Sequence, residues 1–116
     1  MAKNRVLSFK HAFEGIWIAL KEEPNFKLHL LAGFLVFILG LFLGISNLDW
    51  ILLTITIGLV VSLELTNTAI EELVDSFTDG VHPAAKKAKD VAAGAVLIAS
   101  ITAFIIGLFI FLPYFI

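Results

Sequence analysis

The chain contains no cysteine among its 116 residues, and few of its residues carry charge. The absence of cysteine excludes disulfide bridges, thiolate metal sites and a cysteine nucleophile. Charged residues make up 16% of the sequence, and the formal net charge is −2. This balance gives no indication of a nucleic-acid partner, and we expect none.

Familiar nucleotide- and metal-binding motifs are also missing. The sequence has no G-x-x-x-x-G-K-[ST] loop, no G-x-G-x-x-G fingerprint, no H-E-x-x-H pair and no G-x-S-x-G elbow. Its three histidines are too dispersed to indicate zinc. A nucleotide, if the protein binds one, must occupy another kind of site.

Apolar residues are abundant instead, at 59% of the sequence with a mean hydropathy of +0.99. This composition predicts one all-α integral membrane domain over residues 1–116. Residues 5–22 predict an amphipathic helix, which we expect to lie in the membrane interface. Its apolar side chains recur at spacings of three and four: Val6, Phe9, Phe13, Ile16, Trp17 and Leu20. Its charged side chains fall on the other side: Lys10, Glu14 and Lys21.

Three further stretches predict membrane-spanning helices, at about 28–45, 50–75 and 84–112, with a short turn at 46–49. Every lysine and arginine lies either before the first span or between the second and third. Basic residues favour the cytoplasmic side of a membrane. We therefore expect a cell-membrane protein with its N-terminus in the cytoplasm and its C-terminus outside.

A row of acidic side chains runs along the predicted second span and out of it. At about 100° per residue, Glu64, Glu71 and Asp75 share one stripe with Asn67, and Glu72 lies at its edge. A carboxylate at the centre of a bilayer costs roughly 2.5–3.5 kcal/mol by insertion scales. Acids that only follow a helix into water would explain Glu72 but not Glu64, so the stripe indicates a functional site.

Carboxylates at a membrane surface suit Mg²⁺, which prefers oxygen ligands and commonly takes one or two from the protein. The basic cluster Lys86-Lys87-Ala88-Lys89 follows eleven residues after Asp75. Lysine beside carboxylates and a metal ion is what phosphate handling requires. Lys86 and Lys87 are equally well explained as anchors that fix the topology.

The segments "ELTNTAIEELVD" (64–75) and "HPAAKKAKDVAAGAVLIA" (82–99) resemble the signature of the bacterial diacylglycerol kinase/undecaprenol kinase family. The chain length, the N-terminal helix and the three spans agree as well. The resemblance implies a homotrimeric membrane enzyme that phosphorylates a lipid alcohol with MgATP in sites shared between subunits.

The resemblance also implies roles for individual residues. Glu64 would be the catalytic base, and Glu71 and Glu23 would be the magnesium ligands, with the adjacent Glu22 as the alternative to Glu23. Asn67 and Asp75 would shape the site. The nucleotide contacts would include both metal ligands and the following residues: Arg5, His11, Gly80, Val81, His82, Lys89 and Asp90.

The acceptor lipid is a separate question. "SFKHAFEGI" (8–16) and "PNFKLH" (24–29) look more like the undecaprenol kinase branch, in which His29 stands where the diacylglycerol kinase pattern has an acid. Undecaprenol is therefore the expected acceptor, with diacylglycerol as the alternative. An ion carrier would need polar groups through the outer leaflet, and a purely structural protein would not need the acid stripe.

Overall fold

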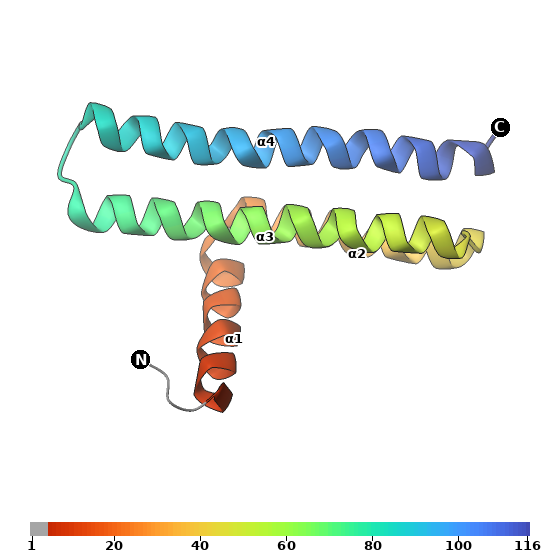
Figure 1. The fold of residues 1–116 in the computed structure, drawn as a ribbon, viewed down its shortest axis with the longest axis horizontal. Coiled ribbons are helices and arrows are strands. Elements are labelled where there is room, and N and C mark those ends of the chain that lie inside the picture. Colours follow the sequence, from red (N-terminus) through yellow and green to blue (C-terminus); the bar gives the residue numbers. More distant parts are fainter. Residues whose placement is uncertain (1–4) are drawn as a thin grey trace.

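The computed structural model describes residues 5–116, with side chains from Ser8 onward. Its elements are α1 (Arg5–Glu22), α2 (Pro24–Leu43), α3 (Asn47–Phe77), α4 (Pro83–Phe111) and a short 3-10 helix η1 (Leu112–Tyr114). Three of these helices are long and apolar enough to cross a membrane, as expected for an all-α membrane protein. α3 packs against both α2 and α4, and α1 runs crosswise to all three (Figure 1).

The first span differs from its predicted range of 28–45. α2 begins at Pro24, because the fixed φ of proline suits the first turn of a helix, where its missing N–H is not needed. α2 ends at Leu43, and Gly44 follows with a φ of 63°, a left-handed conformation that favours glycine. The helix is therefore shifted toward the N-terminus relative to the prediction.

The predicted turn at 46–49 was wrong beyond its first residue, because α3 already begins at Asn47 rather than at Trp50. Ser46 caps this helix, and its hydroxyl accepts a hydrogen bond from the Asp49 N–H at 3.1 Å. The other end also runs past its predicted limit of residue 75, to Phe77. A capping signal therefore outweighed the hydropathy pattern that suggested a later start.

α4 begins at Pro83 and ends at Phe111, each one residue before its predicted limit of 84 or 112. The 3-10 helix η1 then carries Tyr114 back toward the start of α3. There the Tyr114 hydroxyl donates a hydrogen bond to the Asp49 carboxylate at 3.0 Å. This bond ties the C-terminal end of the chain to the turn between α2 and α3.

The small apolar core lies at this same end of the molecule. Ile45, Leu53 and Ile110 are buried there and pack against partly buried neighbours that include Trp50. Gly40 is needed at this contact, because a Cβ on it would lie 2.9 Å from Cη2 of Trp50. Helices in lipid are held together mainly by such close packing, so this end fixes the relative positions of the spans.

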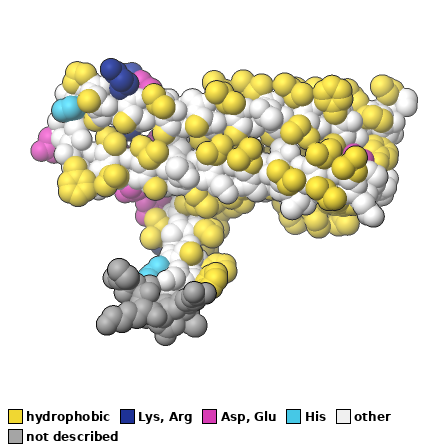
Figure 2. Space-filling model, in the orientation of Figure 1, with side chains coloured by type: hydrophobic (Ala, Val, Ile, Leu, Met, Phe, Trp, Pro, Cys, Tyr) yellow, Lys and Arg dark blue, Asp and Glu magenta, His cyan; other side chains and the backbone are white. Residues whose placement is uncertain are grey.

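α3 is too long to lie wholly within a bilayer. Its 31 residues extend about 46 Å at 1.5 Å per residue, whereas the hydrocarbon core is about 30 Å thick. Roughly the last ten residues therefore project past the hydrocarbon together with the start of α4. Figure 2 shows most of the charged side chains on the visible face gathered at this projecting end and near the junction with α1.

α1 contacts α2 and α3, and Ala19 near its C-terminal end is buried. Phe9, Phe13 and Trp17, from the predicted apolar face, are each more than half exposed, so this face does not pack on the rest of the chain. Val6 and Arg5 precede the described side chains. α1 joins the bundle where α2 begins, which is also where the charged part of α3 starts (Figure 1).

Candidate active site

The acidic stripe of α3 passes from buried to exposed along the helix. Glu64 is buried, with 5% of its surface exposed, while Asn67 and Glu71 are partly buried and Asp75 is exposed. The gradient follows the neighbours of α3, because α4 runs beside it along its whole length whereas α2 does not reach its C-terminal end (Figure 1). One helix therefore carries a carboxylate inside the apolar region and others beyond it.

Glu23 and Glu71 come together although they are far apart in sequence. Desolvation raises the pKa of the Glu23 carboxyl, and the negative charge of Glu71 and a hydrogen bond with its side chain raise it further. Glu72 and Glu22 add smaller effects in the same direction. Of the two adjacent acids at residues 22 and 23, it is thus Glu23 that is partly buried and whose pKa is raised by Glu71.

Two ion pairs follow at the projecting end. The Lys89 ammonium lies 2.9 Å from the Asp75 carboxylate and joins α4 to α3. The Lys86 ammonium lies 2.6 Å from the Asp90 carboxylate, one turn along α4. Both pairs are largely exposed, so they contribute little to stability. The first pair joins the two helices, and both lysines lie beside the space between them.

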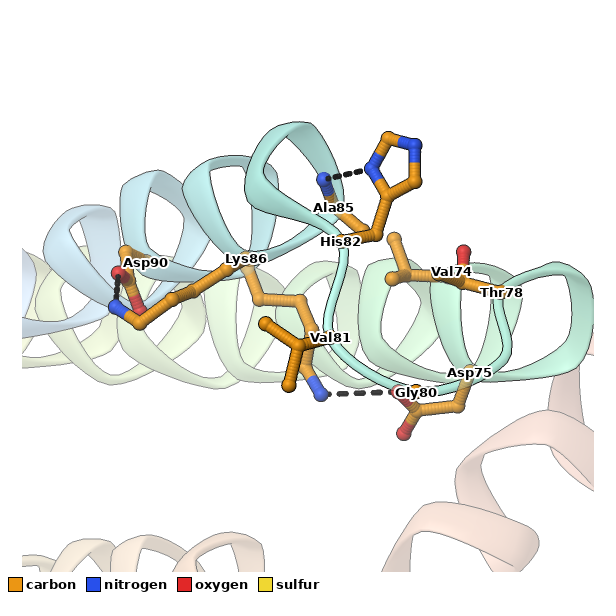
Figure 3. Close-up of a pocket in the computed structure, with 10 residues that line it drawn as sticks. Val74, Asp75, Thr78, Gly80, Val81, His82, Ala85, Lys86 and Asp90 are labelled. Carbon is orange, nitrogen blue, oxygen red and sulfur yellow. Dashed lines mark hydrogen bonds and ion pairs between the residues drawn. The ribbon is translucent and has the colours of Figure 1, made fainter.

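These lysines border a cavity of about 300 Å³ between the end of α3 and the start of α4 (Figure 3). The cavity is lined by every nucleotide contact that the sequence proposed after the second span, and by one of the two site-shaping residues: Asp75, Gly80, Val81, His82, Lys89 and Asp90. The sequence did not identify four other lining residues as site residues: Val74, Thr78, Ala85 and Lys86. Two lysines and two aspartates thus line the cavity, and each lysine is paired with one of the aspartates.

The backbone around this cavity depends on two residues. Gly80 has a φ of 67°, which a residue with a side chain rarely adopts, and this conformation turns the chain from α3 toward α4. His82 caps α4, because its Nδ1 accepts a hydrogen bond from the Ala85 N–H at 3.3 Å. This bond holds the imidazole at the rim of the cavity, and the other ring nitrogen, Nε2, takes no part in it.

Two candidate nucleotide contacts are not brought to the cavity in the described chain. His11 lies on α1, where its Nδ1 is 3.1 Å from the Glu14 carboxylate, and both side chains are mostly exposed. Arg5 is the first residue of α1, and its side chain lies outside the described residues. Glu64 does not line this cavity either, since it lies deeper along α3.

One close neighbour of Glu64 was not among the predicted site residues. His29 of α2 lies with its Nδ1 3.4 Å from the Glu64 carboxylate. Glu23 lies six residues before His29, and Glu71 lies seven after Glu64, so one antiparallel register of α2 on α3 produces both pairs. The sequence analysis used His29 only to distinguish the two acceptor lipids. A contact between residues of different helices leaves no periodic pattern in one sequence, so its pairing with Glu64 was not predicted.

The side-chain oxygens of Glu23, Glu71 and Asn67 provide only part of the ligand set that a hard divalent cation needs. Among residues 8–116, no three acidic or histidine side chains converge closely enough to hold a metal by themselves. Glu23 and Glu71 nevertheless supply two neighbouring carboxyl groups, and the side-chain oxygen of Asn67 is buried without a hydrogen-bond partner. Such a set suits Mg²⁺, which takes its remaining ligands from phosphate and water.

Comparison with known proteins supports one family. Residues 10–111 match the family described as prokaryotic diacylglycerol kinase. The undecaprenol kinase of Bacillus subtilis is 49% identical over 91% of this chain and 86% of its own length. The diacylglycerol kinase of Escherichia coli K12 is 32% identical over 82% of this chain and 78% of its own. That of Synechocystis is 40% identical over 97% of this chain, which spans 65% of its length.

The raised pKa of Glu23 predicts how the variant Glu23→Gln behaves. Between the ordinary value of 4.5 and the raised one, the folded protein binds more protons than the unfolded chain, so stability falls as pH rises through this window. In magnesium-free buffer the variant should therefore melt at a higher temperature than the parent at pH 7. At about pH 3.5, below both values, the difference should vanish. Tryptophan fluorescence in detergent reports the melting.

Asp79→Asn is the control, since Asp79 is exposed and makes no ion pair within the described chain. It should melt like the parent at both pH values. A Glu23→Gln protein that is less stable at pH 7, or equally stabilised at both pH values, would contradict the prediction.

Proposed function

This chain belongs to the prokaryotic diacylglycerol kinase family and is a multi-pass membrane lipid kinase that uses ATP, and from this premise we propose that it phosphorylates undecaprenol to undecaprenyl phosphate. The observation that carries the choice of acceptor is the 49% identity to an undecaprenol kinase over most of both chains. Diacylglycerol, with phosphatidic acid as the product, is the alternative, because other relatives are diacylglycerol kinases. Residues 1–116 form a single lipid-kinase domain.

The two substrates require different surroundings. The hydroxyl of a long-chain lipid alcohol stays near the membrane surface, whereas ATP cannot enter hydrocarbon. A helix that carries reactive side chains from one region into the other lets the two meet. The gradient from buried Glu64 to exposed Asp75 along α3 supports this arrangement.

Glu64 acts as the general base in this proposal. Its carboxylate takes the proton from the lipid hydroxyl as the hydroxyl oxygen forms a bond to the γ-phosphorus of ATP. The bond between that phosphorus and the bridging oxygen of the β-phosphate breaks, and ADP leaves with the electron pair. Phosphoryl transfer depends mainly on positioning and charge stabilisation, which suits a site with few reactive groups.

Glu23 and Glu71 hold Mg²⁺ in this proposal, and the ion supplies positive charge that offsets the phosphate oxygens. Lys89 adds a further positive charge at the transferring phosphoryl group. Gly80, Val81, His82 and Asp90 contact the nucleotide from the cavity between α3 and α4. The neighbourhood of Glu23 and Glu71 and the position of Lys89 beside Asp75 support these roles.

Four other residues complete the proposed site. Asn67 and Asp75 shape it, the first through a buried side-chain oxygen that has no partner and the second through its ion pair with Lys89. Arg5 and His11 contact the nucleotide from α1 in the site shared between subunits, since α1 does not bring His11 to the cavity of its own chain. α1 lies in the membrane interface, with its exposed aromatic side chains in contact with lipid.

The N-terminus lies in the cytoplasm and the C-terminus outside, which gives the site access to cytoplasmic ATP. The placement of all lysines and arginines supports this orientation. A cysteine introduced at Asn47 should react with a membrane-impermeant reagent added to whole cells, and one at Thr78 should react only after lysis. The opposite pattern would overturn the orientation.

The protein assembles as a homotrimer with sites shared between subunits. α3 packs against α2 and α4, but these three helices do not enclose the polar stripe on their own. Crosslinking in detergent should therefore yield trimers. A monomer that keeps full activity would contradict shared sites.

The acceptor can be tested directly with purified protein in mixed micelles. Undecaprenol should be phosphorylated with a kcat/KM at least about tenfold above that of dioleoylglycerol, a difference of about 1.4 kcal/mol in transition-state binding. Labelled ATP and separation of the lipid products give both values. If dioleoylglycerol is the better acceptor, phosphatidic acid becomes the assigned product.

Glu64→Gln and Glu71→Gln should fail in different ways. Glu64→Gln keeps the shape of the side chain but removes the base, so MgATP should still bind while kcat falls by about 10²–10⁴-fold. Glu71→Gln removes a metal ligand, so MgATP binding should weaken, and raised Mg²⁺ should restore part of the turnover. Neither change should unfold the protein, because removing a charge near hydrocarbon removes a desolvation cost.

Glu72→Gln is the matched control, because Glu72 is on the same helix, exposed and at the edge of the stripe. Its turnover should stay close to that of the parent. Near-normal turnover by Glu64→Gln would exclude Glu64 as the base.

A further inference from the structure

Glu64 is the most buried carboxylate of the α3 row, and its neighbour His29 comes from a different helix. The His29 Nδ1 lies 3.4 Å from the nearer Glu64 oxygen, and Glu64 has 6% of its side chain exposed. No other ion pair involving Glu64 occurs within the described residues. A buried carboxylate and an imidazole thus face each other across the contact between α2 and α3.

The imidazole nitrogen that faces Glu64 has no other partner. His29 Nδ1 is buried and makes no hydrogen bond within the described chain, although it lies 3.4 Å from a Glu64 carboxylate oxygen. Buried polar atoms without a partner are uncommon and call for an explanation. At 3.4 Å, the Glu64 oxygen lies only slightly beyond the usual N–H···O distance of about 2.7–3.2 Å.

On its other side His29 borders an apolar cavity of about 470 Å³ between α2, α3 and α4. Apart from His29, its lining includes only two residues with hydroxyl groups, Thr56 and Ser100. The Thr56 hydroxyl already donates to the Leu52 carbonyl at 2.7 Å. The cavity therefore offers His29 mostly hydrocarbon, and the Glu64 carboxylate is its nearby polar group.

The backbone holds His29 firmly in this place. It lies in the second turn of α2, and Phe26 one turn earlier is completely buried. The same antiparallel register brings Glu23 to Glu71. The imidazole is therefore fixed by the packing of two helices rather than carried on a loop.

We propose that His29 is a positioning residue whose Nδ1–H donates a hydrogen bond to Glu64 and holds this carboxylate toward the acceptor hydroxyl. The inference rests on the proposed role of Glu64 as the base. One carboxylate oxygen accepts the bond from His29 and the other stays free to take the proton. Catalytic hydrogen bonds are often long without substrate and tighten once it binds.

Two substitutions distinguish positioning from simple filling of space. The side-chain nitrogen of asparagine can take the place of Nδ1, whereas that of glutamine extends toward the place of Nε2. His29→Asn should therefore keep kcat within about threefold of the parent, whereas His29→Gln and His29→Leu should lose about 10–10²-fold, as for a misplaced reacting group. The KM for MgATP should stay unchanged in all three.

A double substitution tests whether His29 acts through Glu64. In the Glu64→Gln background, adding His29→Leu should change the residual kcat by less than about twofold, because the group that His29 positions is already gone. Losses that multiply instead would overturn the proposal. Ser100→Ala is the matched control, since it removes a polar group from the same cavity and should leave kcat unchanged.

Every variant is first checked for the parent's elution volume in detergent and for MgATP binding, so that misfolding is recognised. If Glu64→Gln keeps its turnover, the proposed role of Glu64 fails. If Glu64→Gln loses turnover but His29→Gln and His29→Leu keep theirs, the positioning role alone is overturned. Equal losses in His29→Asn and His29→Gln would also overturn it.

Discussion

The cost of placing a carboxylate beside hydrocarbon governs the arrangement of this protein. Glu64 is buried within the apolar part of α3, where an ionised group without partners is strongly disfavoured. The chain limits this cost by bringing an imidazole against the carboxylate and by letting the later acids of the stripe emerge into solvent. The length of α3 is what makes both possible, since it exceeds the thickness of a bilayer.

The alignment of α2 along α3 decides which side chains lie beside the buried Glu64 and the later acids of the stripe. A single antiparallel alignment sets His29 beside Glu64 and Glu23 beside Glu71. The connection between α3 and α4 then sets Lys89 beside Asp75 and folds the segment from Gly80 to His82 around a cavity. The apolar core that fixes the helices lies at the other end, around Ile45 and Leu53. The apolar core and the cavity bordered by the two lysines therefore lie toward opposite ends of the molecule.

A site built on helix faces differs from the glycine-rich loops that most nucleotide-binding proteins use. The absence of those loops from the sequence agrees with a lipid kinase whose charged groups come from α3, α4 and the residue before α2. Such a site needs little loop structure, because a membrane surface already holds the lipid acceptor in two dimensions.

The sequence by itself determined the three apolar helices, the crosswise N-terminal segment as a separate helix, the acid stripe from Glu64 to Asp75 and the family. Periodicity and composition contain the helices and the stripe, because each depends on residues close together in the chain. The family was indicated by the resemblance of segments 64–75 and 82–99 to its signature. Helix ends were less well determined, as with Asn47, where the Ser46 cap outweighed hydropathy. Only the tertiary structure decided that His29 faces Glu64, that Glu23 rather than Glu22 is the partly buried acid affected by Glu71, and that Lys89 pairs with Asp75. These pairs depend on how one helix is shifted along another, which close packing fixes and a one-dimensional pattern does not record.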